Sequence, residues 1–331
     1  MSSKFEEVVE RLRLGEIETG LSEKRRLSWV KYCYHFSDIE NIVSILSTGM
    51  LYSRNEAIAQ GSMINDNASR EVIDGTSSIF KDYVRFYFRP QTPTQFNNEG
   101  FRGKNNLGLL QAHCPFPIFL LFDIVQILNM KNTKFSEMSL AKNNQHQLLT
   151  TPEEFENLPF SMIYHNSWMT PEEKGDIISH RHAEIIVSNQ VEIDSVLEVI
   201  LVRSLAEMRT LLYLLPPSIK QKYSHKIRID SQKNAFFGRW VYFEDVTLIP
   251  TSIVVDVNFG ETLTVFELSA SVLDHECEQT YTYLVSKWTP VSKFELALPK
   301  TMRNYSVKIY LDGHIAFADK FVHRNEDELP F

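Results

Sequence analysis

Apolar residues in the first part of the chain recur with helical and strand-like spacings in turn. Residues 1–30 carry apolar side chains at helical intervals between charged ones, and they predict one leading helix. Residues 29–37 are aromatic and β-branched and predict a strand, whereas residues 38–51 return to the helical spacing. Asp38 and Gly49 are residue types that cap the two ends of a helix. The pattern therefore predicts a strand that runs directly into a helix.

Strands and helices continue to alternate through the middle of the chain. The polar residues 53–82 predict a long surface loop, and residues 83–88 then predict a strand. Prolines at 90 and 93 predict irregular structure after this strand. The apolar segments at residues 116–128, 181–187, 196–202 and 225–229 predict further strands, and the first of these segments runs into a helix. A separate helix is predicted over residues 206–215. This mixture predicts an α+β fold.

The pattern changes near residue 235, where short alternating runs follow one another to the end of the chain. About seven such runs, separated by turn residues at roughly 8–12-residue intervals, are typical of a β-sandwich. We therefore expect a small all-β sandwich of immunoglobulin-like type after the α+β part. The predicted organisation is a leading helix (1–30), a main domain (31–234) and an accessory domain (235–331).

Composition restricts the class of protein. The chain has 331 residues, of which 43% are hydrophobic, and this is enough for a sizeable core and for two domains. The N-terminus is charged and lacks the apolar segment of a secretory signal, and no apolar run reaches the roughly 18 residues of a membrane span. The three cysteines lie far apart, which predicts reduced thiols and no zinc site. These features predict a cytoplasmic protein without a membrane segment or a metal.

The net charge of −8 at first disfavours a nucleic-acid partner, because such proteins are usually more basic. The acidity is concentrated at the C-terminal end, however. Residues 235–331 contain 14 acidic and 8 basic residues, whereas residues 1–234 contain 28 acidic and 26 basic residues. The predicted main domain is therefore nearly neutral and can still carry a local basic groove.

Three short segments of the main domain carry residues suited to chemistry. His35–Ser37 ends a predicted strand just before a helix, a place where phosphates and sugars are often held. The segment Phe86–Pro90 ends the next strand, and Arg181–Glu184 opens a later one. A glutamate in an apolar strand is costly to bury without a partner, although Glu184 could also face water at a sheet edge. Taken alone, His35 favours the interpretation of a core histidine bonded to the backbone.

In this order and spacing, the segments His-Phe-Ser, Phe-Tyr-Phe-Arg-Pro and Arg-His-Ala-Glu resemble the DarT family of nucleic-acid ADP-ribosyltransferase toxins. The resemblance covers about residues 30–230. It implies an ADP-ribosyltransferase-like split β-sheet with helices, and NAD as the substrate that supplies ADP-ribose. It also implies a toxin from a toxin–antitoxin or phage-defence system, with single-stranded DNA or RNA as the acceptor and an antitoxin, and in some systems a chaperone, as partners.

The resemblance also implies roles for individual residues. His35 would contact a ribose of NAD, and backbone groups of Phe36 and Ser37 would hold the nicotinamide amide. Glu184 would stabilise positive charge on the ribose carbon and accept a proton from the attacking base. The remaining NAD-binding positions that it implies are Ser44, Tyr52 and Tyr87.

Arg89 is the second catalytic candidate, although many family members carry their arginine two positions later, where this chain has Gln91. One branch of the family has the sequence Arg-Pro-x-Thr-Pro-Thr-Gln, which residues 89–95 match, and it is associated with bases other than thymine. The resemblance therefore does not imply thymidine as the acceptor. Arg89 could instead hold a phosphate of NAD or of the acceptor strand.

Other interpretations of the same residues remain open. His180 and His182 are close to Glu184, but they have no cysteine or aspartate partner at a spacing typical of metal sites. The aromatic group formed by Tyr164, His165 and Trp168 could stack on an acceptor base or simply fill the core. The main alternatives for the whole chain are a non-catalytic interaction protein on a decayed transferase fold and a transferase that modifies protein.

Overall fold

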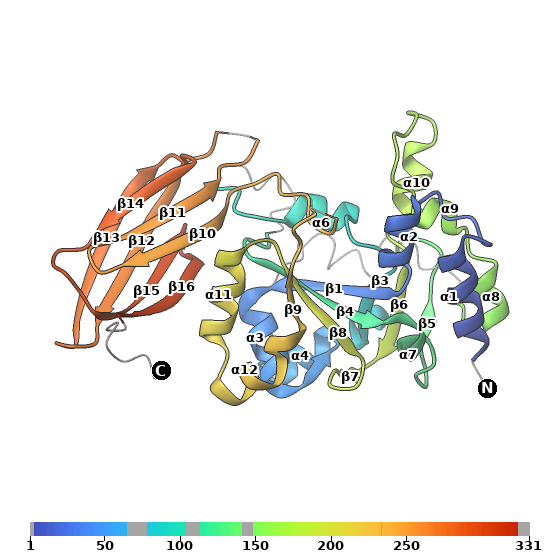
Figure 1. Ribbon diagram of the computed structural model, residues 1–331. Helices are drawn as coiled ribbons and strands as arrows, with labels where there is room; N and C mark the ends of the chain where they lie inside the picture. Colours follow the sequence, from blue (N-terminus) through green and yellow to red (C-terminus); the bar gives the residue numbers. More distant parts are fainter. Residues whose placement is uncertain are drawn as a thin grey trace, which may run out of the picture.

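The structure is a computed structural model that describes residues 3–64, 78–103, 113–140, 148–232, 234–261 and 263–323. A large mixed sheet with helices forms one part of the molecule, and the C-terminal strands form a second part beside it (Figure 1). Helix α11 (Leu205–Leu214) lies between the two parts. The predicted mixture of helices and a sheet is confirmed.

The large sheet contains seven strands among the described residues, in the order β5-β6-β3-β1-β4-β8-β9. Strands β8 and β9 are parallel, and the other neighbours are antiparallel. The strands are β1 (Tyr32–Asp38), β3 (Tyr83–Tyr87), β4 (Pro117–Asp123), β5 (Lys134–Phe135), β6 (Glu184–Ser188), β8 (Leu197–Val202) and β9 (Ile227–Ile229). A separate two-stranded sheet pairs β2 (Met50–Tyr52) with β7 (Gln190–Glu192).

The two central strands of the large sheet diverge. Strand β1 pairs with β4 along all of its seven residues, but with β3 it shares a single pair, Tyr34 with Tyr87. Strand β3 continues its own pairing with β6 on its other side. The sheet is therefore split between β1 and β3, as the resemblance to the transferase family implied, and side chains of both strands can reach the space between them.

Helices cover the sheet and the ends of the split. They are α1 (Lys4–Leu14), α2 (Glu23–Trp29), α3 (Ile39–Thr48), α4 (Arg54–Ala59), α6 (Pro93–Asn98), α7 (Ile124–Leu128), α8 (Pro152–Glu156), α9 (Phe160–Ile163), α10 (Lys174–His180), α11 and α12 (Pro217–Tyr223). In α3 the Asp38 side chain accepts a hydrogen bond from the Glu40 amide, and Gly49 ends the helix in the left-handed conformation, as the sequence predicts.

Four local predictions need correction. The loop expected at residues 53–82 contains helix α4 and a 3-10 helix (Ser78–Asp82), and its residues 65–77 lie outside the described residues. Residues 1–30 form two helices rather than one, because Gly15 takes a left-handed conformation (φ 81°) and ends α1. The strand expected from residue 181 begins only at Glu184, since Arg181 caps the end of α10. The segment after Pro90 is not irregular throughout. Pro93 occupies the first turn of α6, where its missing N–H costs nothing, and Thr92 caps that helix.

The C-terminal strands form two sheets, in the orders β10-β11-β14 and β13-β12-β15-β16 within the described residues. Both sheets contribute to one buried core, which includes Val255 of the first and Val307 of the second. The strands are β10 (Tyr242–Ile249), β11 (Ser252–Asn258), β12 (Phe266–Asp274), β13 (Gln279–Trp288), β14 (Lys293–Ala297), β15 (Asn304–Leu311) and β16 (His314–Val322). Alternation along these strands buries one side of each sheet, as their sequence pattern predicts.

The C-terminal part is attached to the first part through α11. Ala206 is buried in the core of the C-terminal strands, and the Ser204 hydroxyl donates a 2.6 Å hydrogen bond to the Phe243 carbonyl. The amide of Ala318 on β16 donates to the Thr210 hydroxyl at 3.1 Å. Ala235 and Phe236, before β10, stay with the large sheet, since Phe236 packs on Phe119 of β4. The contact between the two parts is thus buried and hydrogen-bonded.

In the described parts of the chain, no helix is both long and apolar enough to cross a membrane.

Candidate active site

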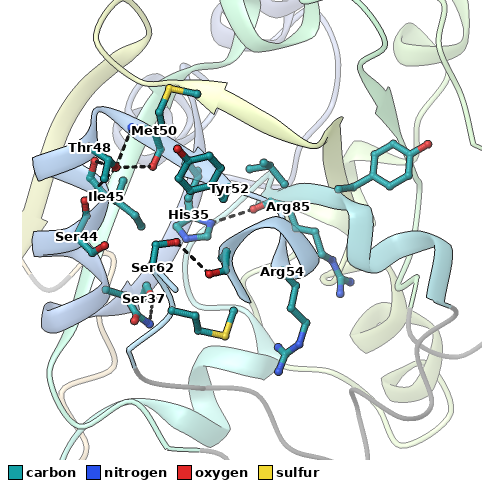
Figure 2. A pocket seen from close by; sticks show the side chains of 16 residues that line it. His35, Ser37, Ser44, Ile45, Thr48, Met50, Tyr52, Arg54, Ser62 and Arg85 are labelled. Atoms are coloured by element: carbon teal, nitrogen blue, oxygen red, sulfur yellow. Dashed lines mark hydrogen bonds between the residues drawn. The ribbon is translucent and has the colours of Figure 1, made fainter. Parts of the chain in front are cut away.

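A pocket opens where β1 and β3 diverge, and α3, β2 and α4 close its sides (Figure 2). Its cavity measures about 190 Å³. Figure 2 shows His35 in the middle, with residues of α3 on one side and Arg54 and Arg85 on the other. The polar lining residues that the sequence singled out for NAD are His35, Ser37, Ser44 and Tyr52. The structure thus brings four of the predicted positions together.

His35 has a defined orientation in this pocket. Its Nδ1 lies 3.2 Å from the backbone carbonyl of Arg85, and because a carbonyl can only accept, Nδ1 must carry the proton. Burial lowers the pKa of His35, and the hydrogen bond to Arg85 opposes this shift. The imidazole is therefore neutral at neutral pH, with Nε2 as an acceptor. A neutral acceptor in a polar pocket suits a sugar hydroxyl.

The wall of the pocket next to His35 is held by hydrogen bonds. The Asn41 side-chain amide donates to the Ser37 hydroxyl at 3.0 Å, and the Asn41 carbonyl oxygen accepts from the Ile64 amide at 2.9 Å. Phe36, between His35 and Ser37, points to the opposite face of the sheet, where its ring packs against Phe119. The Phe36 side chain therefore points away from the pocket, and Phe36 is not among the residues that line it.

Glu184 lies beside this pocket and is bound by an arginine of the neighbouring strand. Its side chain is buried, with the residue only 1% exposed. Arg85 donates to both carboxylate oxygens, from Nη2 to Oε1 at 2.7 Å and to Oε2 at 2.6 Å, and from Nε to Oε2 at 2.8 Å. Arg85 also lines the pocket, so the ion pair joins Glu184 to the space around His35. The alternative that Glu184 faces water at a sheet edge is thereby wrong.

Burial and the ion pair act on Glu184 in opposite directions. Burial raises the pKa of the Glu184 carboxyl above its ordinary value, and the Arg85 guanidinium lowers it. For Arg85 burial is the largest single effect and lowers the pKa, but the charges of Glu184 and Tyr87 and the hydrogen bonds to Glu184 together outweigh it, so the net shift is upward. Burial is the larger effect, so the net shift of the Glu184 pKa is upward, and the Arg85 guanidinium, which stays protonated at neutral pH, favours the ionised form of Glu184 against it.

Tyr87 is the residue directly opposite Glu184 in the pairing of β3 with β6. Paired residues of antiparallel strands project from the same face of a sheet, so the two side chains are neighbours. Burial raises the pKa of Tyr87, and the charge of Glu184 adds to this rise. Tyr87 does not line the pocket around His35. The structure places it beside the carboxylate instead.

Arg89, the second predicted catalytic residue, lies elsewhere. Its guanidinium is buried, donates to the carbonyls of Pro90 and His165, and stacks on the Trp29 ring with 4.9 Å from Cζ to the ring centroid. The arginine that contacts Glu184 is Arg85, which the sequence interpretation overlooked. The sequence contained a signal for Arg85, because side chains alternate along β3 and residues 85 and 87 therefore lie on one face of the sheet.

The two histidines near Glu184 bind backbone carbonyls. His180 Nδ1 lies 2.8 Å from the Glu137 carbonyl, and His182 Nδ1 lies 2.9 Å from the Ile178 carbonyl. Across the described ranges, no group of three or more His, Cys, Asp or Glu side chains is arranged to hold a metal ion. Both histidines therefore have structural contacts on Nδ1.

Comparison with known proteins connects this geometry to a family. Among solved structures, DarT of Thermus sp. 2.9 in complex with NAD+ is 18% identical, with a TM-score of 0.44, over 60% of this chain and 92% of that chain. Thermus sp. 2.9 DarT in complex with ADP-ribosylated ssDNA is 17% identical, with a TM-score of 0.43, over 61% of this chain and 95% of that chain. A search of curated proteins finds no match.

A sequence model of the family described as "ssDNA thymidine ADP-ribosyltransferase, DarT" matches residues 34–237. This range covers more than half of the chain and contains the split strands, His35, Arg85 and Glu184. The chain belongs to the DarT family of ADP-ribosyltransferases.

Proposed function

We propose that this protein transfers ADP-ribose from NAD onto a base of single-stranded DNA, with release of nicotinamide. The observation that carries the proposal is the buried carboxylate of Glu184, held by Arg85 beside a pocket that contains a neutral His35. A buried carboxylate kept ionised by one arginine is costly for a protein to maintain, and such groups concentrate at functional sites.

The pocket suits the nucleoside parts of NAD, which carry hydroxyl groups and an amide. His35 Nε2 offers an acceptor to a ribose hydroxyl, and Ser37, Ser44 and Tyr52 add further hydroxyl groups. Backbone groups of Phe36 and Ser37 would bind the nicotinamide amide. The Thermus sp. 2.9 DarT structures are complexes with NAD+ and with carba-NAD+.

The chemistry expected of Glu184 follows from its charge. When the bond between nicotinamide and ribose breaks, positive charge develops on the ribose carbon, and an ionised carboxylate nearby stabilises it. As the base nitrogen attacks this carbon it loses a proton, which the same carboxylate can accept. Tyr87, next to Glu184, is placed to contact the acceptor side of the reaction.

A base must leave its stack before its ring or amino nitrogen can attack, so single strands are the less costly acceptor. The family description names single-stranded DNA and thymidine. We propose single-stranded DNA for this chain without assigning the base, because residues 89–95 match the branch associated with other bases. Messenger RNA in a phage-defence setting is the second candidate acceptor. The labelling experiment described below also tests the alternative of a protein acceptor.

We further propose that residues 235–331 form an accessory domain of immunoglobulin-like type that follows the catalytic domain at 31–234. The strand orders β10-β11-β14 and β13-β12-β15-β16 around one core support this assignment. Its acidic surface and the setting expected of a toxin suggest that it binds an antitoxin or a chaperone. The first 30 residues would dock on the catalytic domain, where α1 already contacts α7 and α8.

The acceptor is tested by incubating the purified chain with NAD labelled in the adenylate part and with separate pools of single-stranded DNA, RNA and protein. We expect label on DNA, and mass spectrometry of the digested product identifies the base. Label on RNA alone would favour the messenger RNA candidate. Label on protein alone would overturn the proposal of a nucleic-acid acceptor.

Toxicity in bacteria gives an independent test of catalysis. Expression of the chain is expected to arrest growth, and expression of the Glu184→Gln variant at the same level is not, because the damage requires transfer. Equal toxicity of the two proteins would favour the alternative of a non-catalytic interaction protein, as would no toxicity from either.

Arg85→Gln is expected to lower the transfer rate about 10- to 100-fold at neutral pH and to move the acid limb of the kcat profile to higher pH. The sign follows from the ion pair. Arg85 lowers the pKa of Glu184 against the effect of burial, so its loss leaves burial unopposed and Glu184 takes up a proton at higher pH. Arg85→Lys is the matched control because it keeps a positive charge. Superimposable pH profiles of Arg85→Gln and the wild type would contradict this role.

A further inference from the structure

A group of arginines on the acceptor side of Glu184 has no carboxylate partner. It contains Arg25 on α2 and Arg89 after β3, whose Cζ atoms lie 5.6 and 4.9 Å from the centroid of the Trp29 ring, and Arg181 at the end of α10. In the part of the chain that the structure describes, none of the three forms an ion pair. We call this group the arginine cluster. Three positive charges without an acidic neighbour are unfavourable unless an anion joins them.

Arg89 is the buried centre of the cluster. Among the described residues its guanidinium donates to neutral acceptors, namely the carbonyls of Pro90, Ile163 and His165 and the side-chain oxygen of Asn166 at 3.3 Å. Burial lowers the pKa of Arg89 well below its ordinary value, and the charges of Arg181 and Arg25 add to this shift. The guanidinium is thus bound but not neutralised.

Arg181 and His165 each keep a buried polar atom unused. Arg181 donates from Nη2 to the Gln91 carbonyl at 2.8 Å, whereas its buried Nε has no partner among the described residues. His165 contacts the Ser167 hydroxyl through Nε2, and its buried Nδ1 is likewise without a partner there. Burying such a group without a hydrogen bond is unfavourable. The Arg181 and His165 side chains as a whole are only partly buried, so an anion bound at this surface can offer them the missing acceptor.

The cluster lies at the opposite end of β3 from the NAD pocket. Along this strand Arg85 lines the pocket, Tyr87 faces Glu184, and Arg89 follows within about 7 Å of Tyr87 along the chain. Arg181 precedes Glu184 by three residues and is bonded to the turn at Gln91. Glu184 thus stands between the pocket and the cluster.

We propose that the arginine cluster binds a backbone phosphate of the single-stranded acceptor next to the base that is modified. This inference rests on the proposed function, since a strand that presents a base to Glu184 must carry its phosphates past one side of that residue. Guanidinium groups recognise phosphate through paired hydrogen bonds. Because the cluster and the pocket lie on different sides of Glu184, the acceptor supplies this phosphate and NAD does not.

Trp168 supports a strand as the ligand. It belongs to the same short segment as His165 and Asn166, which bind Arg89, and it is 79% exposed. A tryptophan this exposed contributes little to the core. Beside a cationic site it provides a stacking surface for a neighbouring base, which is the usual combination in proteins that bind single strands.

The test compares Arg181→Gln and Arg25→Gln with the wild type, with Lys174→Gln as a control that removes an exposed positive charge of α10. Binding of fluorescein-labelled single-stranded DNA of mixed sequence is followed by anisotropy over a series of salt concentrations. Each cluster variant is expected to weaken binding about tenfold and to reduce the salt slope by about 0.7, as for one lost phosphate contact. The control is expected to stay within about twofold of the wild type.

A second measurement separates the two sources of phosphate. The NAD-dependent rise in Tm is expected to be the same in the wild type and both cluster variants. Loss of that rise with unchanged DNA binding would assign the cluster to NAD and overturn the inference. DNA binding like that of the wild type in both variants would also overturn the inference. A wild-type protein that neither binds nor modifies DNA would instead refute the proposed function itself.

Discussion

Substitution of Glu184 by glutamine is expected to slow ADP-ribosyl transfer to single-stranded DNA about a thousandfold or more. Glutamine fills the same space and can still accept a hydrogen bond from Arg85, so the strand pairing around it should persist. It cannot stabilise positive charge on the ribose carbon as a carboxylate does, and it cannot accept a proton from the attacking base. The loss should therefore fall on the chemical step.

This distinction is measurable in single-turnover reactions with labelled NAD. The rate constant should fall in Glu184→Gln, whereas the NAD-dependent rise in Tm should stay close to that of the wild type, because the pocket residues are unchanged. Glu192→Gln is the matched control, since it removes an exposed carboxylate from the nearby strand β7. A Glu184→Gln variant that retains more than about a tenth of the wild-type rate would remove this residue from the chemistry.

The sequence predicts best the features that neighbouring residues decide. Asp38 and Gly49 cap α3 through their own side chain and backbone, so the helix and its position after β1 could be predicted directly. The same is true of the alternation in the C-terminal strands. The separation of β1 from β3 follows from pairing between distant segments, and only the resemblance to a family implied it.

The site shows the same division. His35, Ser37, Ser44 and Tyr52 lie on successive elements between residues 32 and 52, and the structure places all four around one pocket. The choice between Arg85 and Arg89 depended on where β3 ends. Had the strand continued, both residues would have shared the face of Tyr87. Strand β3 ends at Tyr87, and Pro90 and the left-handed Gln91 (φ 56°) prevent its continuation, so Arg89 lies outside the pairing with β6 and binds the carbonyls of Pro90 and His165 instead of Glu184.

The second large effect concerns stability at the contact between the catalytic part and the C-terminal strands. Glu207 on α11 is only 2% exposed, and its carboxylate accepts from the amide of Arg203 at 2.8 Å and from Nε of Arg203 at 2.7 Å. The guanidinium of Arg203 also lies over the Tyr242 ring, with 4.6 Å from Cζ to the centroid. Neither charge has access to water that could replace its partner.

Glu207→Ala is therefore expected to lower the free energy of unfolding by about 3–5 kcal/mol, because it leaves Arg203 charged, buried and unpaired. Urea unfolding followed by tryptophan fluorescence measures the loss as a lower midpoint at an unchanged slope. Glu207→Gln should cost less, since its carbonyl oxygen can still accept one of the bonds from Arg203.

The double variant Arg203→Met, Glu207→Leu separates the ion pair from the space that it fills. Removal of both charges avoids the unpaired guanidinium, so the double variant should be more stable than Glu207→Ala, although the Arg203 amide loses its acceptor in both. A double variant as unstable as Glu207→Ala would show that the packing of the two side chains, rather than their charges, holds α11 against β10. Glu207→Ala with a loss below about 1 kcal/mol would contradict the buried pair as the cause, because exposed ion pairs contribute only that much.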